Sequence, residues 1–278
     1  MALRALDGLQ AVTRRLCICV DDFGLHAGVN AAALALVAQG RVHALACQVG
    51  GPAWADGAVE LRRLDGVDLG LHLDLTEYPL CEPARPLGRL IAASLLRRLD
   101  PPALTVEIAA QLDRFEDHVG HPPDFVDGHQ HVHQLPQVRE ALLAELLRRG
   151  PARPWLRSTR RPQRLAWRFK PWLIEWLGTA ELERQARHAG FFRRNHALLG
   201  VYDFAPSGPG FGRLLPGWLA ASDDGDLLMC HPSLPVEVQG DTILAARVAE
   251  FCVLGGSGLD ALLAAQGITL ARLSQTTR

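Results

Sequence analysis

Short apolar segments alternate with helical segments along the 278 residues of this chain, and this alternation constrains the fold more than any other feature. Apolar runs bounded by polar or turn residues are typical of buried strands. The expected strands are 16–20, 42–49, 67–73, 124–127, 155–158, 226–230 and 268–270. Strands that alternate with helices form parallel βα units, so the sequence predicts either a doubly wound sheet or a (β/α) barrel.

Helical segments fill most of the intervals between these strands. The expected helices are 29–39, 52–64, 87–99, 105–119, 137–149, 241–254 and 259–265. Arginine, tryptophan and proline are interspersed between residues 160 and 200, where we expect one or two helices without assigning their bounds. Neither a linker nor a shift in composition divides the chain, so we predict one domain over residues 1–278.

Composition and charge narrow the class of protein. Hydrophobic residues make up 48% of the chain, which is enough for a sizeable core, and the formal net charge of −1 gives no global reason to expect nucleic-acid binding. A short apolar run separates Arg15 from Asp21; it is too short for a secretory signal, and no run approaches a membrane span. We therefore predict a soluble, cytoplasmic protein.

Three histidines alternate with other residues after one of the expected strands, in Asp127-Gly128-His129-Gln130-His131-Val132-His133. In an extended strand, alternate side chains point to the same side, so these rings would share one face. Imidazole is the commonest side-chain ligand of metal ions. A solvated histidine tract is the alternative, but Phe125 and Val126 precede the run and Leu135-Pro136 follows it. We interpret the run as the end of a buried strand that enters a metal-bearing active site.

Polar, titratable residues also stand at the ends of other expected strands. Asp21 and Asp22 follow the first strand, His72 lies near the end of the third, and His231 follows the strand 226–230. Functional residues of parallel sheets gather at the carboxyl ends of the strands, so we expect these side chains to converge. Each has an ordinary alternative, because aspartates cap helices and single histidines occur in cores.

This set of residues suits hydrolysis by metal-activated water. Two imidazoles and one carboxylate leave coordination positions open on a divalent ion, which lowers the pKa of its water and polarises a carbonyl. A second carboxylate then serves as base, and a histidine on the far side protonates the leaving group. Such an assembly cleaves an amide or ester without a protein nucleophile, and no GxSxG motif competes with it.

Five segments, in order, resemble motifs of the YdjC-like (ChbG-type) carbohydrate deacetylases. They are Val20-Asp21-Asp22-Phe23-Gly24-Leu25 with Gly28-Val29-Asn30, Gly70-Leu71-His72-Leu73-Asp74-Leu75-Thr76, Asp127 to His133 with Leu135-Pro136, Gly200-Val201-Tyr202-Asp203-Phe204, and Met229-Cys230-His231-Pro232. The resemblance covers a core of about residues 16–270. It implies a single-domain irregular (β/α) barrel of parallel strands that removes N-acetyl groups from amino sugars such as chitooligosaccharides.

The resemblance also implies roles for individual residues and a cofactor. The family's metal ligands match Asp22, His72 and His129, its catalytic base matches Asp21, and the histidine that assists the leaving amine matches His231. His131 and His133 match additional histidines near the metal or substrate, and Arg157 is a candidate to orient Asp21. The expected cofactor is one divalent ion, with magnesium and zinc favoured, and no other cofactor is expected. Val20 and Ser233 depart from the family's usual residues.

Three alternatives stay open. A metal-dependent amidohydrolase or esterase could act on another N-acyl compound or on a glycolipid-linked amino sugar, because specificity resides in loops around the site. An arginine-rich stretch at 148–170 would suit a nucleic-acid-binding protein, although codon bias or a solvated helix face also accounts for it. A binding-only relative without catalysis is the third. We expect a small carbohydrate as partner, no nucleic acid and no membrane, and we leave a homodimer open.

Overall fold

All the strands of the structure are parallel and belong to one sheet. The computed structural model describes residues 13–166, 168–191, 195–205 and 210–275. Its strands are β1 (Arg14–Phe23), β2 (Ala44–Cys47), β3 (Asp68–Leu73), β4 (Phe125–Gly128), β5 (Trp155–Leu156), β6 (Leu198–Leu199), β7 (Asp226–Cys230) and β8 (Ile268–Leu270). They pair in the order β5-β4-β3-β2-β1-β7-β6, and β8 pairs with the first residues of β1.

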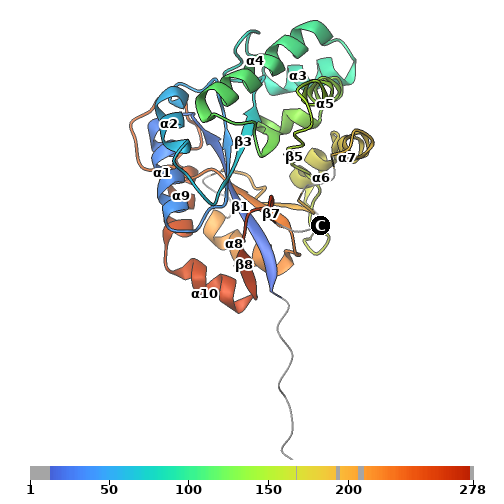
Figure 1. Cartoon of the computed structure of the whole chain (residues 1–278). Coiled ribbons are helices and arrows are strands. Elements are labelled where there is room, and N and C mark those ends of the chain that lie inside the picture. Colours follow the sequence, from blue (N-terminus) through green and yellow to red (C-terminus); the bar gives the residue numbers. More distant parts are fainter. Residues whose placement is uncertain (1–12, 167, 192–194, 206–209, 276–278) are drawn as a thin grey trace, which may run out of the picture.

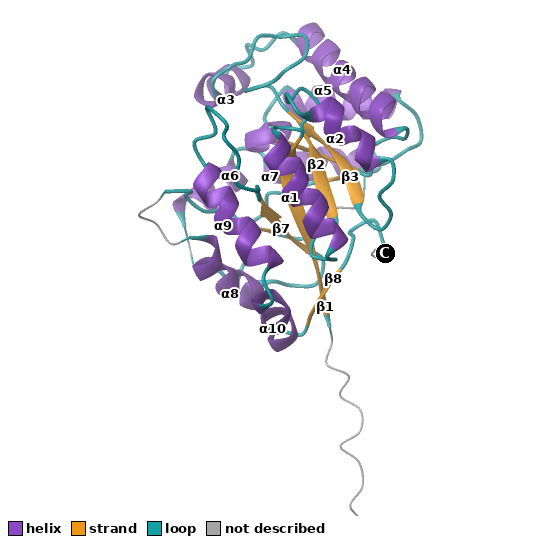
Figure 2. Cartoon of the chain, turned by 90° about the vertical axis from the view of Figure 1, so that its left-hand side faces the viewer, coloured by secondary structure: helices purple, strands orange, loops and turns teal. Residues whose placement is uncertain are grey.

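Helices surround this curled sheet (Figures 1 and 2). They are α1 (Ala27–Ala38), α2 (Trp54–Leu61), α3 (Leu87–Leu95), α4 (Pro101–Val119), α5 (Val138–Arg148), α6 (Phe169–Trp176), α7 (Thr179–His188), α8 (Phe211–Ala221), α9 (Leu244–Gly255) and α10 (Gly258–Ala265), with a 3₁₀-helix η1 (His129–Gln134) after β4. In Figure 1, α1, α2 and α9 lie on one side of the sheet and α5, α6 and α7 on the other. The chain is therefore an α/β domain with an open half-barrel, and the predicted fold class is confirmed.

The alternation of side chains along the central strand explains the two hydrophobic clusters. Leu16, Ile18 and Val20 belong to a large cluster with residues of the surrounding helices. Cys17 and Cys19 lie on the opposite face of β1, in a smaller cluster that includes residues of β2, β4, β5 and β7. Successive strand residues point to opposite faces, so β1 is buried on both sides, as its continuous apolar sequence predicts.

Most elements agree with the expected segments to within a few residues, and β7 and β8 agree at both ends. The two helices α6 and α7 account for the region between 160 and 200. β6 and α8 were not predicted from the sequence. β6 is only two residues long, and α8 contains Pro216 in its interior, which is unusual because proline lacks the helical N–H. Among the described residues, no single helix is long and apolar enough to span a membrane; only α9 and α10 taken together, bent by 67°, meet that test.

Candidate metal and catalytic site

A cavity of about 910 Å³ lies where the carboxyl ends of β1, β3, β4 and β7 meet. The five residues singled out in the sequence all line it: Asp21, Asp22, His72, His129 and His231. The convergence expected from the parallel βα pattern is therefore present. These residues come from four different strands or the segments that directly follow them, so the sheet itself positions the cluster.

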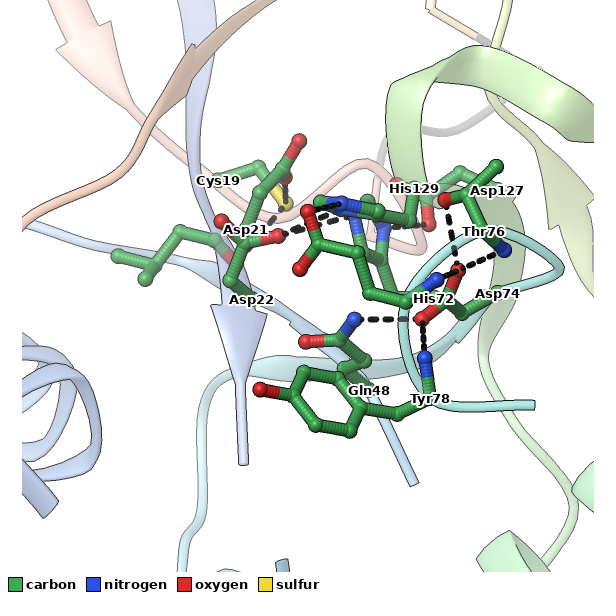
Figure 3. A network of polar contacts seen from close by, with 12 residues as sticks. Cys19, Asp21, Asp22, Gln48, His72, Asp74, Thr76, Tyr78, Asp127 and His129 are labelled. Atoms are coloured by element: carbon green, nitrogen blue, oxygen red, sulfur yellow. Dashed lines mark hydrogen bonds and ion pairs between the residues drawn. The ribbon is translucent and has the colours of Figure 1, made fainter. Parts of the chain in front are cut away.

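Asp22, His72 and His129 present ligand atoms that all lie within 4.8 Å of one another. Asp22 Oδ1 is 3.0 Å from His129 Nδ1 and 3.4 Å from His72 Nε2. The two rings meet edge to face, with centroids 5.5 Å apart. Figure 3 shows the three side chains gathered at one point, and all three are buried. Two ring nitrogens and one carboxylate oxygen at this spacing could hold a divalent ion.

The backbone of β1 is irregular where it delivers its two aspartates. The register with β2 shifts between Val20 and Phe23, and Asp22 adopts a φ of 66°. This left-handed conformation is costly for a residue other than glycine, and it re-aims the Asp22 side chain. Adjacent residues of a regular strand would point to opposite sides, but Asp21 and Asp22 both reach the cavity. They nevertheless have different partners.

A hydrogen bond to Asp127 fixes the orientation of His72. His72 Nδ1 lies 2.6 Å from Asp127 Oδ1, so Nδ1–H donates to the carboxylate and Nε2 is left facing Asp22. Burial lowers the pKa of His72, but the Asp127 and Asp22 carboxylates outweigh burial and raise it to about 9. An outer carboxylate of this kind orients a metal-binding histidine and raises its basicity.

Asp22 holds His129 on one side and Arg247 on the other. Asp22 Oδ2 accepts a hydrogen bond of 2.7 Å from Arg247 Nη2, while Oδ1 faces the histidines. Burial would raise the pKa of Asp22, but Arg247 and His129 hold it well below its usual range. Conversely, Asp22 raises the pKa of His129 well above its ordinary value against the effect of burial. Asp22 is therefore an ionised carboxylate with one oxygen directed at both rings.

Asp74 shapes the loop after β3. It lies two residues after His72, in the segment Gly70 to Thr76. Asp74 Oδ1 accepts the N–H of Thr76 at 2.7 Å, and Oδ2 accepts the N–H of Tyr78 at 2.7 Å (Figure 3). Side-chain bonds of this type stabilise tight turns. The turn carries Glu77, whose Oε1 lies 3.2 Å from His129 Nε2.

Arg157, the residue that directly follows β5, binds the Asp21 carboxylate. Arg157 Nη1 and Nη2 donate to the two Asp21 oxygens at 2.6 and 2.7 Å, and Nη2 also lies 2.6 Å from Asp127 Oδ2. Burial raises the pKa of Asp21, but the Arg157 guanidinium overrides it and holds the pKa far below its usual range. Bidentate pairing of this kind fixes both the charge and the direction of a carboxylate. The structure therefore brings Arg157 to Asp21, as the sequence analysis expected.

His231 reaches the cavity from the segment that follows β7. Its backbone N–H donates to Glu250 Oε2, and its ring packs edge to face on Phe204 with centroids 5.2 Å apart. Tyr202 Oη–H donates to the other oxygen of Glu250 at 2.6 Å. Burial lowers the pKa of His231 to about 4, against the opposing effect of Asp22 and Asp21. Among the residues that the structure describes, its Nδ1 has no hydrogen-bond partner, so this nitrogen is available to a bound molecule.

The prediction that residues 129–133 continue as an extended strand is wrong. They form the 3₁₀-helix η1, in which Gln130 and His131 have φ values of 52° and 61°. Pairing of β4 with β3 ends at Gly128, so no neighbour extends the strand further. The three rings consequently do not share one face. His129 joins the cluster and His131 lines the cavity, but His133 Nε2 is bonded to the backbone oxygen of Arg157 at 3.0 Å.

Three buried contacts were not foreseen from the sequence. Arg247 and Glu250 lie on α9, where charged residues in a helix would ordinarily be read as a solvated face. Asp127 was noted only as the start of the histidine run, yet it links His72 to Arg157. No local pattern signals the contacts of Arg247 and Glu250, because each joins segments far apart in the chain. Asp127 did have a local signal, since it belongs to the same set of alternate residues as the three histidines.

The residues present fit a divalent ion better at one of two possible positions. Asp21, His72 and Asp127 also present ligand atoms within 4.8 Å of one another. However, Arg157 occupies both of those carboxylates, and His72 Nδ1 already donates to Asp127. A cation there would meet a guanidinium and a protonated nitrogen. At Asp22, His72 and His129 the donors face inward, and Nε2 of His72 is directed at the cluster.

Fold and site together define an α/β half-barrel protein with a buried candidate metal cluster at the carboxyl ends of its strands. Residues 15–265 match the family described as YdjC-like protein, and the chain belongs to that family.

Two named relatives and a solved structure are similar over most of the chain, and a third relative over about half of it. The carbohydrate deacetylase of Homo sapiens is 29% identical over 304 residues, covering 93% of this chain and 90% of the relative. The chitooligosaccharide deacetylase of Klebsiella pneumoniae (strain 342) is 27% identical, covering 92% and 97%. The carbohydrate deacetylase of Mus musculus is 33% identical, over about half of each chain. A crystal structure from Enterococcus faecalis V583, of a protein proposed to cleave cellobiose phosphate, has a TM-score of 0.67 at 22% identity and covers 96% of this chain and 100% of its own.

Proposed function

We propose that this protein is a metal-dependent carbohydrate deacetylase that hydrolyses N-acetyl groups of amino sugars such as chitooligosaccharides. The observation that carries the proposal is the convergence of Asp22, His72 and His129 within 4.8 Å, beside Asp21, in one cavity. Two of the relatives similar to nearly the whole chain are named carbohydrate deacetylase and chitooligosaccharide deacetylase. Family and geometry thus support the same reaction class.

Asp22, His72 and His129 would hold the ion. When bound, a divalent ion lowers the pKa of a water molecule and polarises a carbonyl oxygen. Of the two ions favoured from the sequence, zinc suits this donor set better, because magnesium prefers all-oxygen coordination and imidazole is a good zinc ligand. Arg247 keeps Asp22 ionised, and Asp127 accepts the Nδ1 proton of His72, so Nε2 is the nitrogen that would bind the ion after it loses its proton.

Asp21 would take the proton of the attacking water. The Arg157 guanidinium keeps Asp21 ionised, so the carboxylate is in its basic form throughout the neutral range. It also fixes the carboxylate toward the cluster, since both oxygens are bonded to the same planar group. A carboxylate so strongly paired is a weak base, and it therefore suits a water whose pKa has itself been lowered.

His231 would deliver a proton to the leaving amine. Burial favours its neutral form, while the ionised Asp21 and Asp22 favour the protonated form. A neutral imidazole cannot protonate an amine, so His231 must gain a proton before the C–N bond breaks. The proton released from water on the Asp21 side supplies that need without an external acid. Asp21 and His231 thus divide base and acid roles, and the amine leaves protonated.

Acetate release from N,N′-diacetylchitobiose tests the proposal. The protein is stripped of metal with a chelator and then supplied with zinc, magnesium, manganese or cobalt. We expect release with at least one ion and none without it. Asp22→Asn should remove the activity, and Asp260→Asn, a matched change in an exposed ion pair with Arg41, should keep it. Absence of release with every ion contradicts this substrate class. Release from other N-acyl compounds or from esters alone would favour the alternative hydrolases.

The arginine-rich stretch does not favour the nucleic-acid alternative. Most of its guanidinium groups are paired with carboxylates of this chain: Arg148 with Glu145, Arg149 with Asp113 and Glu116, Arg157 with Asp21, Arg160 with Glu183, Arg161 with Glu175, and Arg164 with Asp223. Paired cations have little charge left to attract phosphates. We therefore keep the prediction of a small carbohydrate partner and no nucleic acid.

A further inference from the structure

One wall of the cavity is aliphatic. Beyond the catalytic cluster, the cavity extends to the segment around α3 and α6. The side chains that line it there are Leu87, Ile91, Leu135, Leu173, Ile174 and Leu177. Five of these six are only half-buried, and the sixth, Leu135, is buried. Apolar side chains therefore remain partly open to the same space that the metal cluster faces.

Helical spacing explains why these residues form a continuous surface. Leu87 and Ile91 are four residues apart on α3, and Leu173 on α6 is four residues before Leu177, the C-cap residue of that helix. Residues at this spacing lie on the same face of a helix. α6 has no fully buried residue, so its apolar side chains stay partly open to the cavity, although Ile174 and Leu177 also pack against the hydrophobic clusters. Two helices thus present aliphatic faces to one cavity.

The part of the cavity lining that precedes α9 carries more polar groups than the aliphatic wall does, although Val238 and Ile243 also belong to it. Asp241, Thr242 and Gln239 line it near α9, close to the acidic and basic residues of the cluster. Lys170, at the start of α6, donates to the backbone oxygen of Tyr202 at 2.7 Å and lies 5.3 Å from the centre of the Phe204 ring. Polar residues thus predominate at and beside the candidate catalytic centre, and aliphatic residues predominate along α3 and α6, where Lys170 is the polar member of the lining.

Sugars are recognised by hydrogen-bonding groups and by aromatic rings that stack on their C–H faces. Branched aliphatic side chains offer neither interaction, but they do gain free energy by removing hydrocarbon from water. A cavity of about 910 Å³ is also at the large end of the range for small-molecule sites, about 300–1,000 Å³. The wall is therefore suited to an apolar part of a substrate whose polar part lies at the cluster.

We propose that the substrate is an amphiphilic N-acetylamino sugar whose hydrocarbon aglycone binds against the aliphatic wall of α3 and α6. This inference rests on the proposed function, because it assigns the aglycone to the sugar that is deacetylated. The acetyl group lies at Asp21 and the Asp22 cluster, and the hydrocarbon extends from the other end of the sugar. Free chitooligosaccharides would then leave the wall uncovered.

Two glycoside series test this assignment. Methyl, butyl and octyl β-glycosides of N-acetylglucosamine, kept below their micelle concentrations, are compared by kcat/KM in the metal-loaded protein. Each methylene placed against the wall should raise kcat/KM by up to about fourfold. A parallel series with a methyl aglycone and a lengthened N-acyl chain should show no such gain. A gain only in the acyl series, or in neither series, overturns the proposal.

Substitutions test whether the gain in kcat/KM with a longer aglycone depends on the side chains of the wall. Leu87→Gln and Leu173→Gln should lower the ratio of octyl to methyl activity toward one. Leu95→Gln is the matched control, because Leu95 lies on α3 outside the cavity lining and is 47% exposed. The control should keep the ratio of the unmodified protein. An unchanged ratio in both wall variants contradicts the assignment.

Binding provides a readout that does not require turnover. The octyl and methyl glycosides of glucosamine, which are the deacetylated products, are titrated into the protein by calorimetry. The octyl compound should bind more tightly, with a more negative heat-capacity change, and Leu173→Gln should remove the difference. Equal affinities overturn the apolar subsite. Preferential octyl binding without any deacetylation would keep the subsite and contradict the proposed function, so the two failures are distinguishable.

Discussion

His72 Nδ1 lies 2.6 Å from Asp127 Oδ1, and this contact determines which nitrogen of His72 faces the candidate metal cluster. The carboxylate accepts the Nδ1 proton, so Nε2 is directed at Asp22. Asp127 in turn is 2.6 Å from Arg157, which binds Asp21. One buried carboxylate therefore orients a candidate metal ligand and shares an arginine with the candidate base.

The first prediction concerns Asp127. Asp127→Asn keeps the shape but removes the charge that orients His72, so affinity for zinc should fall by about 10- to 100-fold. A metal titration against a competing chelator measures this. Asp124→Asn, a matched change directly before the same strand, keeps an oxygen that can accept the Leu69 N–H and should leave affinity unchanged. Equal affinities for the two variants would count against the orienting role.

The second prediction separates two neighbouring histidines. His129→Ala should lose bound metal, because it removes one of the three converging ligands. His131→Ala should keep full metal occupancy, since His131 lines the cavity without belonging to the cluster. Metal content after dialysis, measured by elemental analysis, gives both results. Full occupancy in the His129 variant would remove that residue from the ligand set.

The strand ends were predictable because a short stretch of sequence marks each of them, and because all parallel βα units place such ends at the same edge of the sheet. An apolar run that stops at a polar residue marks the end of a buried strand, and parallel βα units bring such ends together. Asp21, Asp22, His72 and His231 were placed in this way, without knowledge of the strand order. His129 was placed at the site for the same reason, although the conformation of its segment was wrong.

The partners of these residues were less predictable because they depend on long-range packing. Arg247 lies 225 positions from Asp22 in the chain, and nothing in α9 distinguishes it from an exposed helical arginine. The left-handed backbone at Asp22, Gln130 and His131 likewise has no signature in the local sequence. It is sustained by the buried contacts around it, which exist only once the sheet has formed.

The third prediction separates chemistry from metal binding. Asp21→Asn should lower turnover by about 10²–10⁴-fold, because an amide cannot accept the water proton. Metal occupancy should persist, since Asp22, His72 and His129 are untouched. Loss of the charge leaves Arg157 paired with Asp127, so the fold should remain intact. Unchanged acetate release would refute the role of Asp21 as base. Loss of the metal would show that Asp21 affects turnover by supporting metal binding at Asp22, His72 and His129.

The final prediction follows from the pKa values of the two candidate histidine ligands. The carboxylates raise the pKa of His72 to about 9 and that of His129 well above its ordinary value. Both rings are therefore protonated in the metal-free protein at pH 7. A metal ion binds only the deprotonated nitrogens, so loading must release protons, and affinity must rise with pH.

The measurement is zinc affinity between pH 6 and 8, with proton release at pH 7 obtained by calorimetry in buffers of different ionisation enthalpy. We expect release of about two protons and an affinity that still rises by about tenfold or more per pH unit at pH 8. Histidines of ordinary pKa, about 6.5, would give an affinity that levels off above about pH 7 and a release of only about half a proton in total. Asp127→Asn should shift the pH dependence toward that ordinary behaviour, because it removes the largest favourable charge acting on His72. A plateau in the unmodified protein would mean that the carboxylates do not hold the rings in their charged form.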